Sequence, residues 1–212
     1  MISRRTFLRT TTLGGATVVA ASCGSPADPA AVDASAGPDA AGCRVTTADA
    51  LGPFFQPGAP ARMQLADANE PGERLQMSGV VVGADCAPIA GALLDVWQAD
   101  RAGDYHGGAV DQFRLRGQVT TDAAGAFAIA TIRPGNYEQA PGAWRPAHLH
   151  FTISHPGHRP VSTQVYFAGD RYLPPNDSCT SCTSEDPDRV IELTGSAAAG
   201  WTGTVRFALA VA

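Results

Sequence analysis

The chain has 212 residues, with 15 basic and 20 acidic side chains, and its formal net charge is -5. Every basic residue is arginine, which excludes Schiff-base chemistry, a lysine general base and a phosphate-binding P-loop lysine. The acidic balance argues against nucleic acid or an anionic membrane surface as a partner, because both are bound through a basic surface. With 23 Gly and 16 Pro, the composition favours a turn-rich β protein.

The first 22 residues have the pattern of an export signal. Arg4, Arg5 and Arg9 are followed by an uncharged run at residues 10–22. This run is rich in Thr, Gly and Ala and is too short to cross a bilayer, which takes about 20 apolar residues. We therefore expect residues 1–22 to be a twin-arginine signal peptide and the protein to be periplasmic or at the cell surface. Cys23 follows directly and predicts a lipid anchor; ordinary signal cleavage after Ser22 is the alternative.

Residues 23–42 consist mainly of Ala, Pro, Asp, Gly and Ser, so we expect a flexible tether there and a folded domain over residues 43–212. Four cysteines remain in that domain. In an oxidising compartment an even set predicts two disulfides, and three pairings stay open. The C-x-x-C pair is expected to be a structural disulfide in a surface loop; a metal or redox motif is the alternative. The four cysteines are Cys43, Cys86, Cys179 and Cys182.

The domain is predicted to be all-β, an antiparallel two-sheet sandwich. Past residue 43 no stretch of a dozen residues has the apolar spacing of a long amphipathic helix, whereas short β-branched or aromatic runs bounded by Gly, Pro or Asp recur. Residues 122–125 predict a hairpin turn between two of these runs. In the last run we expect Val205, Phe207, Leu209 and Val211 to share one face. The predicted strands are 76–82, 92–98, 117–121, 126–132, 147–154, 163–167 and 204–211.

The fifth predicted strand carries His148 and His150, two residues apart. A period of two places both imidazoles on one face, close enough to chelate one metal ion, while their neighbours point into the core. The alternative is a solvent-facing strand with two incidental surface histidines. Tyr105 and Tyr137 each follow a turn close to predicted strands; for them the alternative is a buried ring with a hydrogen-bonded hydroxyl.

Six sequence blocks, in this order along the chain, resemble the intradiol ring-cleavage dioxygenases, in a branch that carries a twin-arginine signal. These are non-haem iron(III) enzymes typified by protocatechuate 3,4-dioxygenase and catechol 1,2-dioxygenase. An ordered set of blocks is more specific than any one motif. The blocks are residues 91–105, 116–117, 121–125, 131–137, 144–151 and 163–170.

The resemblance implies a β-sandwich with one iron(III) per chain, held by two tyrosinates and two histidines. Phenolates are hard anionic oxygen donors, which suit a hard trivalent ion and favour iron(III) over iron(II). The implied substrates are O2 and a small aromatic ortho-diol, whose ring is cleaved to a cis,cis-muconate-type diacid. The implied metal ligands are Tyr105, Tyr137, His148 and His150.

The resemblance also implies three catalytic roles. Tyr137 would act as the base that receives a proton from the incoming diol. Arg145 would stabilise negative charge that develops on the ring, and Gln164 would line the pocket. The alternatives, a surface salt bridge for Arg145 and a solvated amide for Gln164, stay open at this stage.

The chain departs from the resemblance at residues 51–55, Leu-Gly-Pro-Phe-Phe, where relatives have a Glu-Gly-Pro-Tyr-Tyr-like segment. A carboxylate and the tyrosine hydroxyls are therefore missing, and we expect an apolar pocket edge that prefers catechol or an alkyl- or aryl-substituted catechol to a carboxylated one. The segment with Cys179 and Cys182 has no counterpart in the resemblance.

Two other classes of function fit parts of the sequence. A catalytically silent surface binding module could use the same scaffold; loss of an implied iron ligand would favour it, and none is lost. A copper or zinc site around His148 and His150 would need further histidines, but His106, His155 and His158 fall in predicted loops. The sequence predicts no oligomeric state.

Overall fold

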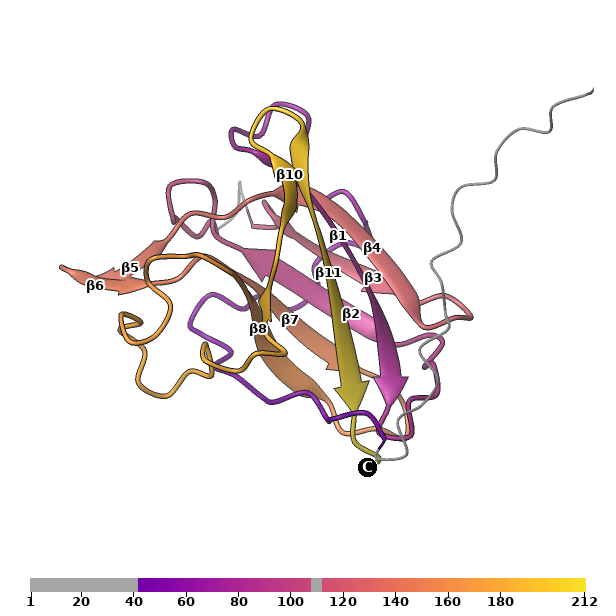
Figure 1. The fold of residues 1–212 in the computed structure, drawn as a ribbon. Helices are drawn as coiled ribbons and strands as arrows, with labels where there is room; N and C mark the ends of the chain where they lie inside the picture. The colour runs from indigo at the N-terminus through magenta and orange to yellow at the C-terminus, as the bar shows by residue number, and fades with distance from the viewer. Residues whose placement is uncertain (1–41, 108–111) are drawn as a thin grey trace, which may run out of the picture. The chain divides into compact units, whose positions relative to one another are not determined.

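The computed structural model describes residues 42–107 and 112–212. The predicted signal peptide, the Cys23 anchor and the tether up to residue 41 lie outside the described residues. The described ranges form strands, turns and irregular segments (Figure 1), so the all-β prediction is confirmed. No helix within these ranges is long and apolar enough to cross a membrane. The strands are β1 Arg74–Gly83, β2 Leu93–Gln98, β3 Arg116–Thr120, β4 Ala126–Ile132, β5 Tyr137–Ala140, β6 Ala143–Arg145, β7 His148–Ser154, β8 Val161–Phe167, β9 Val190–Ile191, β10 Thr194–Ser196 and β11 Gly200–Leu209.

Two sheets pack face to face, one with the strand order β10-β11-β1-β4 and the other with the order β3-β2-β7-β8-β9. The separate hairpin β5–β6 projects beyond them (Figure 1). The prediction of an entirely antiparallel sandwich is wrong for two pairs, because β1 runs parallel to β11 and β8 runs parallel to β9. A parallel pair needs a long crossover connection, which for β1 and β11 is almost the whole domain between them.

Each of the seven predicted runs overlaps one strand, with ends that differ by up to four residues; the strands are β1, β2, β3, β4, β7, β8 and β11. The sequence gives no signal for the other four strands, β5, β6, β9 and β10. These are two to four residues long and mostly exposed or half-buried, so no alternation of apolar and polar residues marks them.

The turn at residues 122–125 forms as predicted, with the Asp122 carboxylate accepting the backbone N–H groups of Ala124 and Ala126. Gly125 has a φ of 71°, and a Cβ there would lie 2.5 Å from the carbonyl oxygen of Val81, so a side chain does not fit. The hairpin prediction is nevertheless wrong, because β3 and β4 belong to different sheets. The turn carries the chain from one layer of the sandwich to the other.

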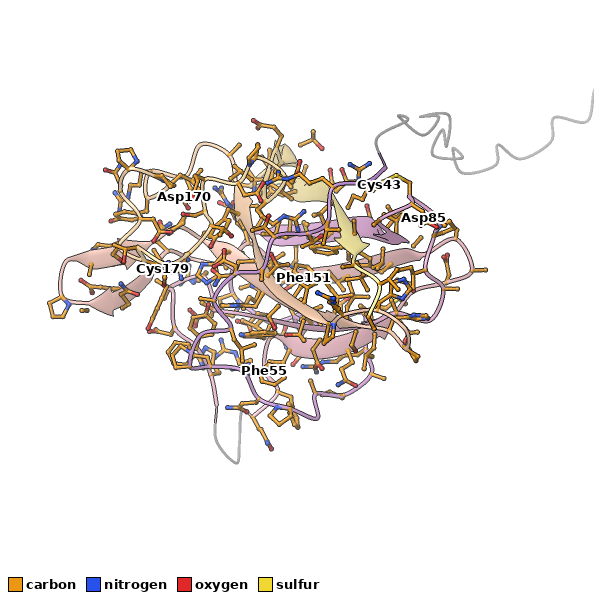
Figure 2. The ribbon with its side chains drawn as sticks, turned by 90° about the horizontal axis from the view of Figure 1, so that it is seen from below. Cys43, Phe55, Asp85, Phe151, Asp170 and Cys179 are labelled. Atoms are coloured by element: carbon orange, nitrogen blue, oxygen red, sulfur yellow. A yellow bond between two sulfur atoms is a disulfide. The ribbon has the colours of Figure 1, made fainter. Side chains whose placement is uncertain are left out.

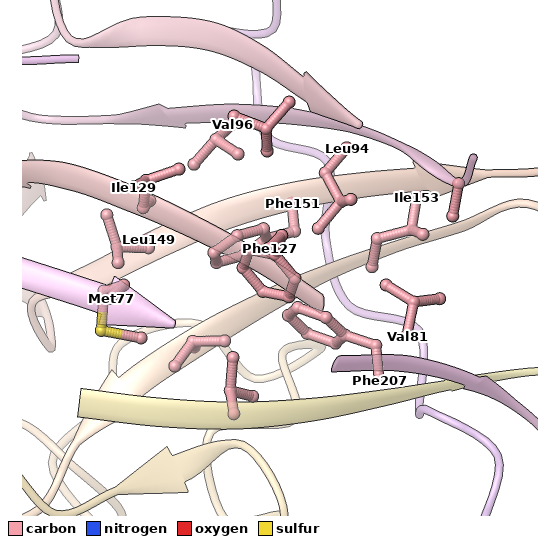
Figure 3. Packing of buried hydrophobic residues seen from close by; sticks show 14 of the residues in the cluster. Met77, Val81, Leu94, Val96, Phe127, Ile129, Leu149, Phe151, Ile153 and Phe207 are labelled. Atoms are coloured by element: carbon pink, nitrogen blue, oxygen red, sulfur yellow. The ribbon is translucent and has the colours of Figure 1, made fainter. Parts of the chain in front are cut away.

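The core between the sheets is aromatic at its centre, where Phe127, Phe151 and Phe207 meet (Figure 3). Burying one such side chain stabilises the fold by about 1.5–3 kcal/mol. Val205, Phe207 and Leu209 of β11 are buried as predicted, but Val211 is 68% exposed. The prediction fails at Val211 because β11 ends at Leu209.

Both predicted disulfides are present, and the structure pairs Cys43 with Cys86 and Cys179 with Cys182. The first joins residues 43 positions apart and the second joins residues 3 apart. Figure 2 shows Cys43 and Cys179 on opposite sides of the domain. The C-x-x-C pair is therefore a local loop closure, as expected.

Candidate metal centre

The outer face of the five-stranded sheet carries the candidate site. Leu149, Phe151 and Ile153 of β7 are 0% exposed in the core, so the alternating residues His148 and His150 point to the other face. These histidines are only 3% exposed each, because other segments cover that face. The alternative of incidental surface histidines is therefore wrong.

Three donor atoms converge above β7. The Tyr105 Oη lies 3.0 Å from the Nε2 atoms of both His148 and His150, and these two nitrogens are 3.1 Å apart. Ligands about 2.0–2.1 Å from one ion and at right angles to each other would be separated by about 2.9 Å. The triangle therefore has the dimensions of one face of a metal coordination shell.

The protonation of these groups also fits a cation. The His148 Nδ1–H donates to the carbonyl oxygen of Pro146 over 2.6 Å, which leaves the Nε2 lone pair free and fixes the ring. Burial and the Arg145 charge lower the pKa of His148 to about 4, and burial lowers the pKa of His150 well below its ordinary value, so both imidazoles are neutral ligands. Burial raises the pKa of Tyr105 above that of free tyrosine, so its phenolate form requires positive charge at the point of convergence.

Tyr137 is the first residue of β5 and reaches the same place from the projecting hairpin. Its ring meets Tyr105 edge-on at a centroid distance of 5.5 Å. The turn before Tyr137 touches the turn before Tyr105: a Cβ on Gly103, whose φ is 91°, would lie 2.0 Å from the carbonyl oxygen of Asn136. The glycine lets the two tyrosine-bearing turns approach closely, and the structure thus brings all four implied ligands together.

Arg145 and Gln164 lie beside these ligands. They are 6% and 0% exposed, so neither the surface salt bridge nor the solvated amide describes them. Gln164 is the β8 residue paired with His150, and its Oε1 accepts a hydrogen bond from Arg145 Nη2 over 3.0 Å. Arg145 also forms a buried ion pair with Asp177, with Nε 2.9 Å from Oδ1.

No sequence pattern indicated the residues that hold Arg145 and Gln164. The Tyr166 hydroxyl accepts from Arg145 Nη2 over 3.0 Å and donates to Asp49 Oδ2 over 2.8 Å. Tyr166 lies within a block of the resemblance, but its polar role depends on contacts with distant segments. We call this group the polar wall; its members are Asp49, Arg145, Gln164, Tyr166 and Asp177.

On the same face of the sheet, aromatic rings lie towards β2, whereas Gln164 and Tyr166 lie on β8 at the other edge of β7. Phe54 stacks on Tyr105 with centroids 4.3 Å apart, and Trp97 of β2 stacks on His150 at 4.6 Å. Phe55 packs against Trp97 at 5.0 Å. We call Phe54, Phe55 and Trp97 the aromatic wall. Its position confirms that the departing segment at residues 51–55 lies against the site.

Several buried polar atoms next to the aromatic wall have no hydrogen-bond partner. They include the Trp97 Nε1, the His150 Nδ1, and the Nε and Nη1 of Arg116, a β3 residue paired with Trp97. The Arg116 guanidinium donates from Nη2 to the carbonyl oxygen of His106 over 2.9 Å. That bond fixes the residue next to Tyr105, so Arg116 supports the ligand loop.

The other histidines do not join the centre. His106 binds Asp100 through a 2.9 Å contact, and His155 and His158 face each other in the turn after β7 with Nδ1 atoms 3.1 Å apart. The described ranges hold no group of three or more His, Cys, Asp or Glu residues that could bind a metal. The oxygen atom at the point of convergence above β7 belongs to Tyr105, which is none of these four residue types.

On this β-sandwich the Tyr105 hydroxyl and two neutral histidines converge, with the Tyr137 ring beside them, and this donor set is of the kind that suits a hard metal ion of the non-haem type. The family model described as Dioxygenase matches residues 51–210, which include all four of these residues and both walls except Asp49. The chain belongs to the intradiol dioxygenase family.

Sequence relatives support this assignment. The chain is 37% identical over 163 residues to the chlorocatechol 1,2-dioxygenase of Rhodococcus opacus, a match that covers 66% of this chain and 63% of that protein. It is 36% identical over 140 residues to catechol 1,2-dioxygenase 2 of Acinetobacter lwoffii, covering 58% of this chain and 51% of the relative. The chain thus spans between half and two thirds of the length of these two relatives.

A solved structure covers the same domain. The dioxygenase domain of a dioxygenase carbohydrate-binding protein fusion from Streptomyces sp. SirexAA-E superposes with a TM-score of 0.67 at 36% identity, covering 80% of this chain and 100% of that one. The similarity therefore extends over most of the described fold.

Proposed function

We propose that this protein is an iron(III) intradiol dioxygenase that cleaves small aromatic ortho-diols with O2 to cis,cis-muconate-type diacids. The observation that carries the proposal is the convergence of the Tyr105 Oη with the Nε2 atoms of His148 and His150, with Tyr137 beside them. Iron(III) bound there would supply Lewis acidity that activates the chelated diol towards O2. The family assignment supports the same chemistry.

The side chains divide the remaining tasks. Tyr105 and Tyr137 are both half-buried, but the Tyr105 Oη lies 3.0 Å from both histidine nitrogens, whereas Tyr137 meets the site through ring contacts with Phe54 and Tyr105. We therefore assign Tyr137 as the tyrosine that receives a proton from the incoming diol. His148 is held in one tautomer by Pro146 and cannot turn away. The two histidines would therefore stay in place as ligands, while Tyr137 would accept the proton.

Arg145 supplies fixed positive charge beside the reacting ring. Its guanidinium is bound by Asp177, Gln164 and Tyr166, so it needs no rearrangement when negative charge develops on the substrate. A preorganised cation in a buried site stabilises such charge far better than one in water. Arg145 is therefore assigned to transition-state stabilisation, and Gln164 to holding it.

The aromatic wall favours apolar catechols. Phe54 contacts both Tyr105 and Tyr137, so a substituent on the bound ring would meet a phenyl face there. The names of two relatives, catechol and chlorocatechol 1,2-dioxygenase, agree with an uncharged ring, whereas another, 40% identical over 113 residues, is named protocatechuate 3,4-dioxygenase beta chain. We assign catechol and alkyl- or aryl-substituted catechols as the preferred substrate class, ahead of protocatechuate.

Oxygen uptake by the iron-loaded protein tests this function. Catechol, 4-methylcatechol, hydroxyquinol and protocatechuate should be assayed side by side, with resorcinol as a meta-diol control that cannot chelate. We expect equal consumption of O2 and ortho-diol, a muconate-type product and no turnover of resorcinol. A preference for protocatechuate would contradict the apolar pocket. Extradiol products, or no O2 uptake by iron-loaded protein, would contradict the reaction class and favour a silent binding module.

The proposal includes export by the twin-arginine route and an anchor at Cys23. The two disulfides fit an oxidising compartment. Arg4→Lys with Arg5→Lys should leave precursor in the cytoplasm, and Cys23→Ser should release the protein from the membrane fraction. Soluble periplasmic wild-type protein would contradict the anchor, and efficient export of the Lys variant would contradict the route.

A further inference from the structure

The segment between β8 and β9, residues 168–189, packs against the polar wall. It carries the Cys179–Cys182 disulfide, which has no counterpart in the sequence resemblance, and lies at the same end of the domain as the projecting β5–β6 hairpin (Figure 1). The backbone N–H of Ser178 donates to the carbonyl oxygen of Trp144, the residue before Arg145, over 3.0 Å. Tyr172 stacks on Trp144 with centroids 5.4 Å apart. The segment is therefore fastened to the strand that presents Arg145.

Asp177 connects the disulfide loop to Arg145. Its side chain is 3% exposed, and its Oδ1 accepts the Arg145 Nε and the backbone N–H of Cys179, each over 2.9 Å. Its Oδ2 accepts the Ser184 hydroxyl over 2.6 Å. One of the two loop groups that orient this carboxylate thus belongs to Cys179, and the other belongs to Ser184, two residues past Cys182.

A second connection reaches the other end of the polar wall. The backbone N–H and hydroxyl of Thr183 donate to Asp49 Oδ2 over 3.2 and 3.0 Å. The same oxygen accepts the Tyr166 hydroxyl, which in turn accepts from Arg145. Residues 177–184 therefore contact the arginine network at two separate points.

The small size of the disulfide ring indicates a local purpose. Cross-linking residues 3 positions apart removes much less entropy from the unfolded chain than cross-linking residues 43 apart, as Cys43–Cys86 does. The Cys179–Cys182 bond is the weaker of the two as a contribution to global stability. What it fixes is the course of the loop that presents Asp177 and Thr183.

We infer that the loop of residues 177–184, closed by Cys179–Cys182, is a positioning element for Arg145, and that Asp177 is a positioning residue for the ring-cleavage reaction. The inference rests on the proposed function. Asp177 neutralises and orients the buried guanidinium without touching substrate, and the disulfide holds Asp177. Turnover therefore depends on this loop although it supplies no metal ligand.

Steady-state kinetics of Asp177→Asn provide the first test. We expect kcat for catechol to fall by about 10- to 100-fold, as for other misplaced catalytic groups, with a much smaller change in KM. Iron content and the visible spectrum should stay as in the wild type, because the metal ligands are untouched. In an Arg145→Gln background the same substitution should have little further effect, since residues that act through one group are not additive.

Cys179→Ser with Cys182→Ser is the second variant, and it leaves every charge in place. We expect a smaller loss of kcat in the same direction, together with faster backbone hydrogen exchange over residues 177–184 in the full chain. Cys43→Ser with Cys86→Ser is the matched control, because that disulfide lies on the opposite side of the domain (Figure 2). It should lower the melting temperature further while leaving kcat unchanged.

The outcomes separate this inference from the proposed function. If the wild type cleaves ortho-diols and both the Asp177 and the Cys179–Cys182 variants match its kcat, the positioning role is overturned and the function stands. If the wild type cleaves no ortho-diol, the function fails, and the exchange measurement still tests the loop. Unchanged exchange over residues 177–184 in the double-serine variant would overturn the role of the disulfide.

Discussion

The two walls of the candidate centre are built by different forces. In the polar wall Arg145 has three acceptors, and Asp49 and Asp177 each accept from more than one donor, so direction and charge fix every member. In the aromatic wall Phe54, Phe55 and Trp97 are placed by ring packing, and neighbouring polar atoms lack partners. Directional bonds tolerate little displacement, whereas packed rings can be exchanged for others of similar volume. The polar wall should therefore control rate and the aromatic wall substrate choice.

The largest effect should follow removal of the cation from the polar wall. Arg145→Gln is expected to lower kcat by about 100- to 1000-fold, the cost of losing one preorganised charge-stabilising group. Arg145→Lys should recover only part of this, because a single ammonium nitrogen does not reproduce the spaced Nε and Nη2 donors that bind Asp177, Gln164 and Tyr166. The measurement is steady-state O2 uptake with catechol. Equal kcat values for the Lys variant and the wild type would show that charge alone suffices.

Deleting one hydroxyl from the polar wall should have the next largest effect. Tyr166→Phe removes one donor to Asp49 and one acceptor for Arg145. Thr183 still donates to Asp49 and Gln164 still accepts from Arg145, so we expect the variant to lose only the net value of the removed hydrogen bonds, about 0.5–1.5 kcal/mol each. We expect a lower free energy of unfolding in urea and a kcat reduced by about tenfold. A variant with wild-type stability would show that the hydroxyl network is not what orders this wall.

Adding one hydroxyl to the aromatic wall is the matched experiment. Phe54→Tyr places a phenol against Tyr105 and Tyr137. The family that this sequence resembles has a tyrosine-containing segment at this position. We expect kcat for catechol to change by less than about threefold, while the ratio of kcat/KM for protocatechuate to that for 4-methylcatechol rises. A loss of kcat as large as that of Tyr166→Phe would remove the distinction between the walls.

The smallest expected effect is the change in melting temperature of the iron-free protein with pH. His148 titrates near 6.5 when unfolded, whereas burial and the Arg145 charge lower its folded pKa to about 4. The folded state therefore binds fewer protons, so this contribution to stability is present above pH 6.5 and is lost as the pH falls towards 4. The melting temperature of the iron-free protein should drop by a few degrees over that window. His148→Gln should reduce the slope, and His158→Gln, in the distant turn, should not.

The sequence supports the fold and the ligands more fully than it supports their surroundings. The period of two in β7 predicts the histidine face, and the ordered blocks indicate Tyr105 and Tyr137. The parallel pairing of β1 with β11 and the crossing at residues 122–125 depend on how distant segments pack, which no local pattern encodes. Asp49 and Asp177 are ordinary acidic residues in irregular segments. Their link to Arg145, direct for Asp177 and through Tyr166 for Asp49, forms only when the chain folds.

The most direct test of the account is the visible spectrum and metal content of the iron-loaded wild type beside Tyr105→Phe and Tyr137→Phe. We expect about one iron per chain and a red-brown colour from phenolate-to-iron(III) charge transfer, with the band altered in each tyrosine variant. A colourless wild type that takes up only zinc or copper when iron is abundant, or a band unchanged in both variants, would contradict the two-tyrosinate iron centre.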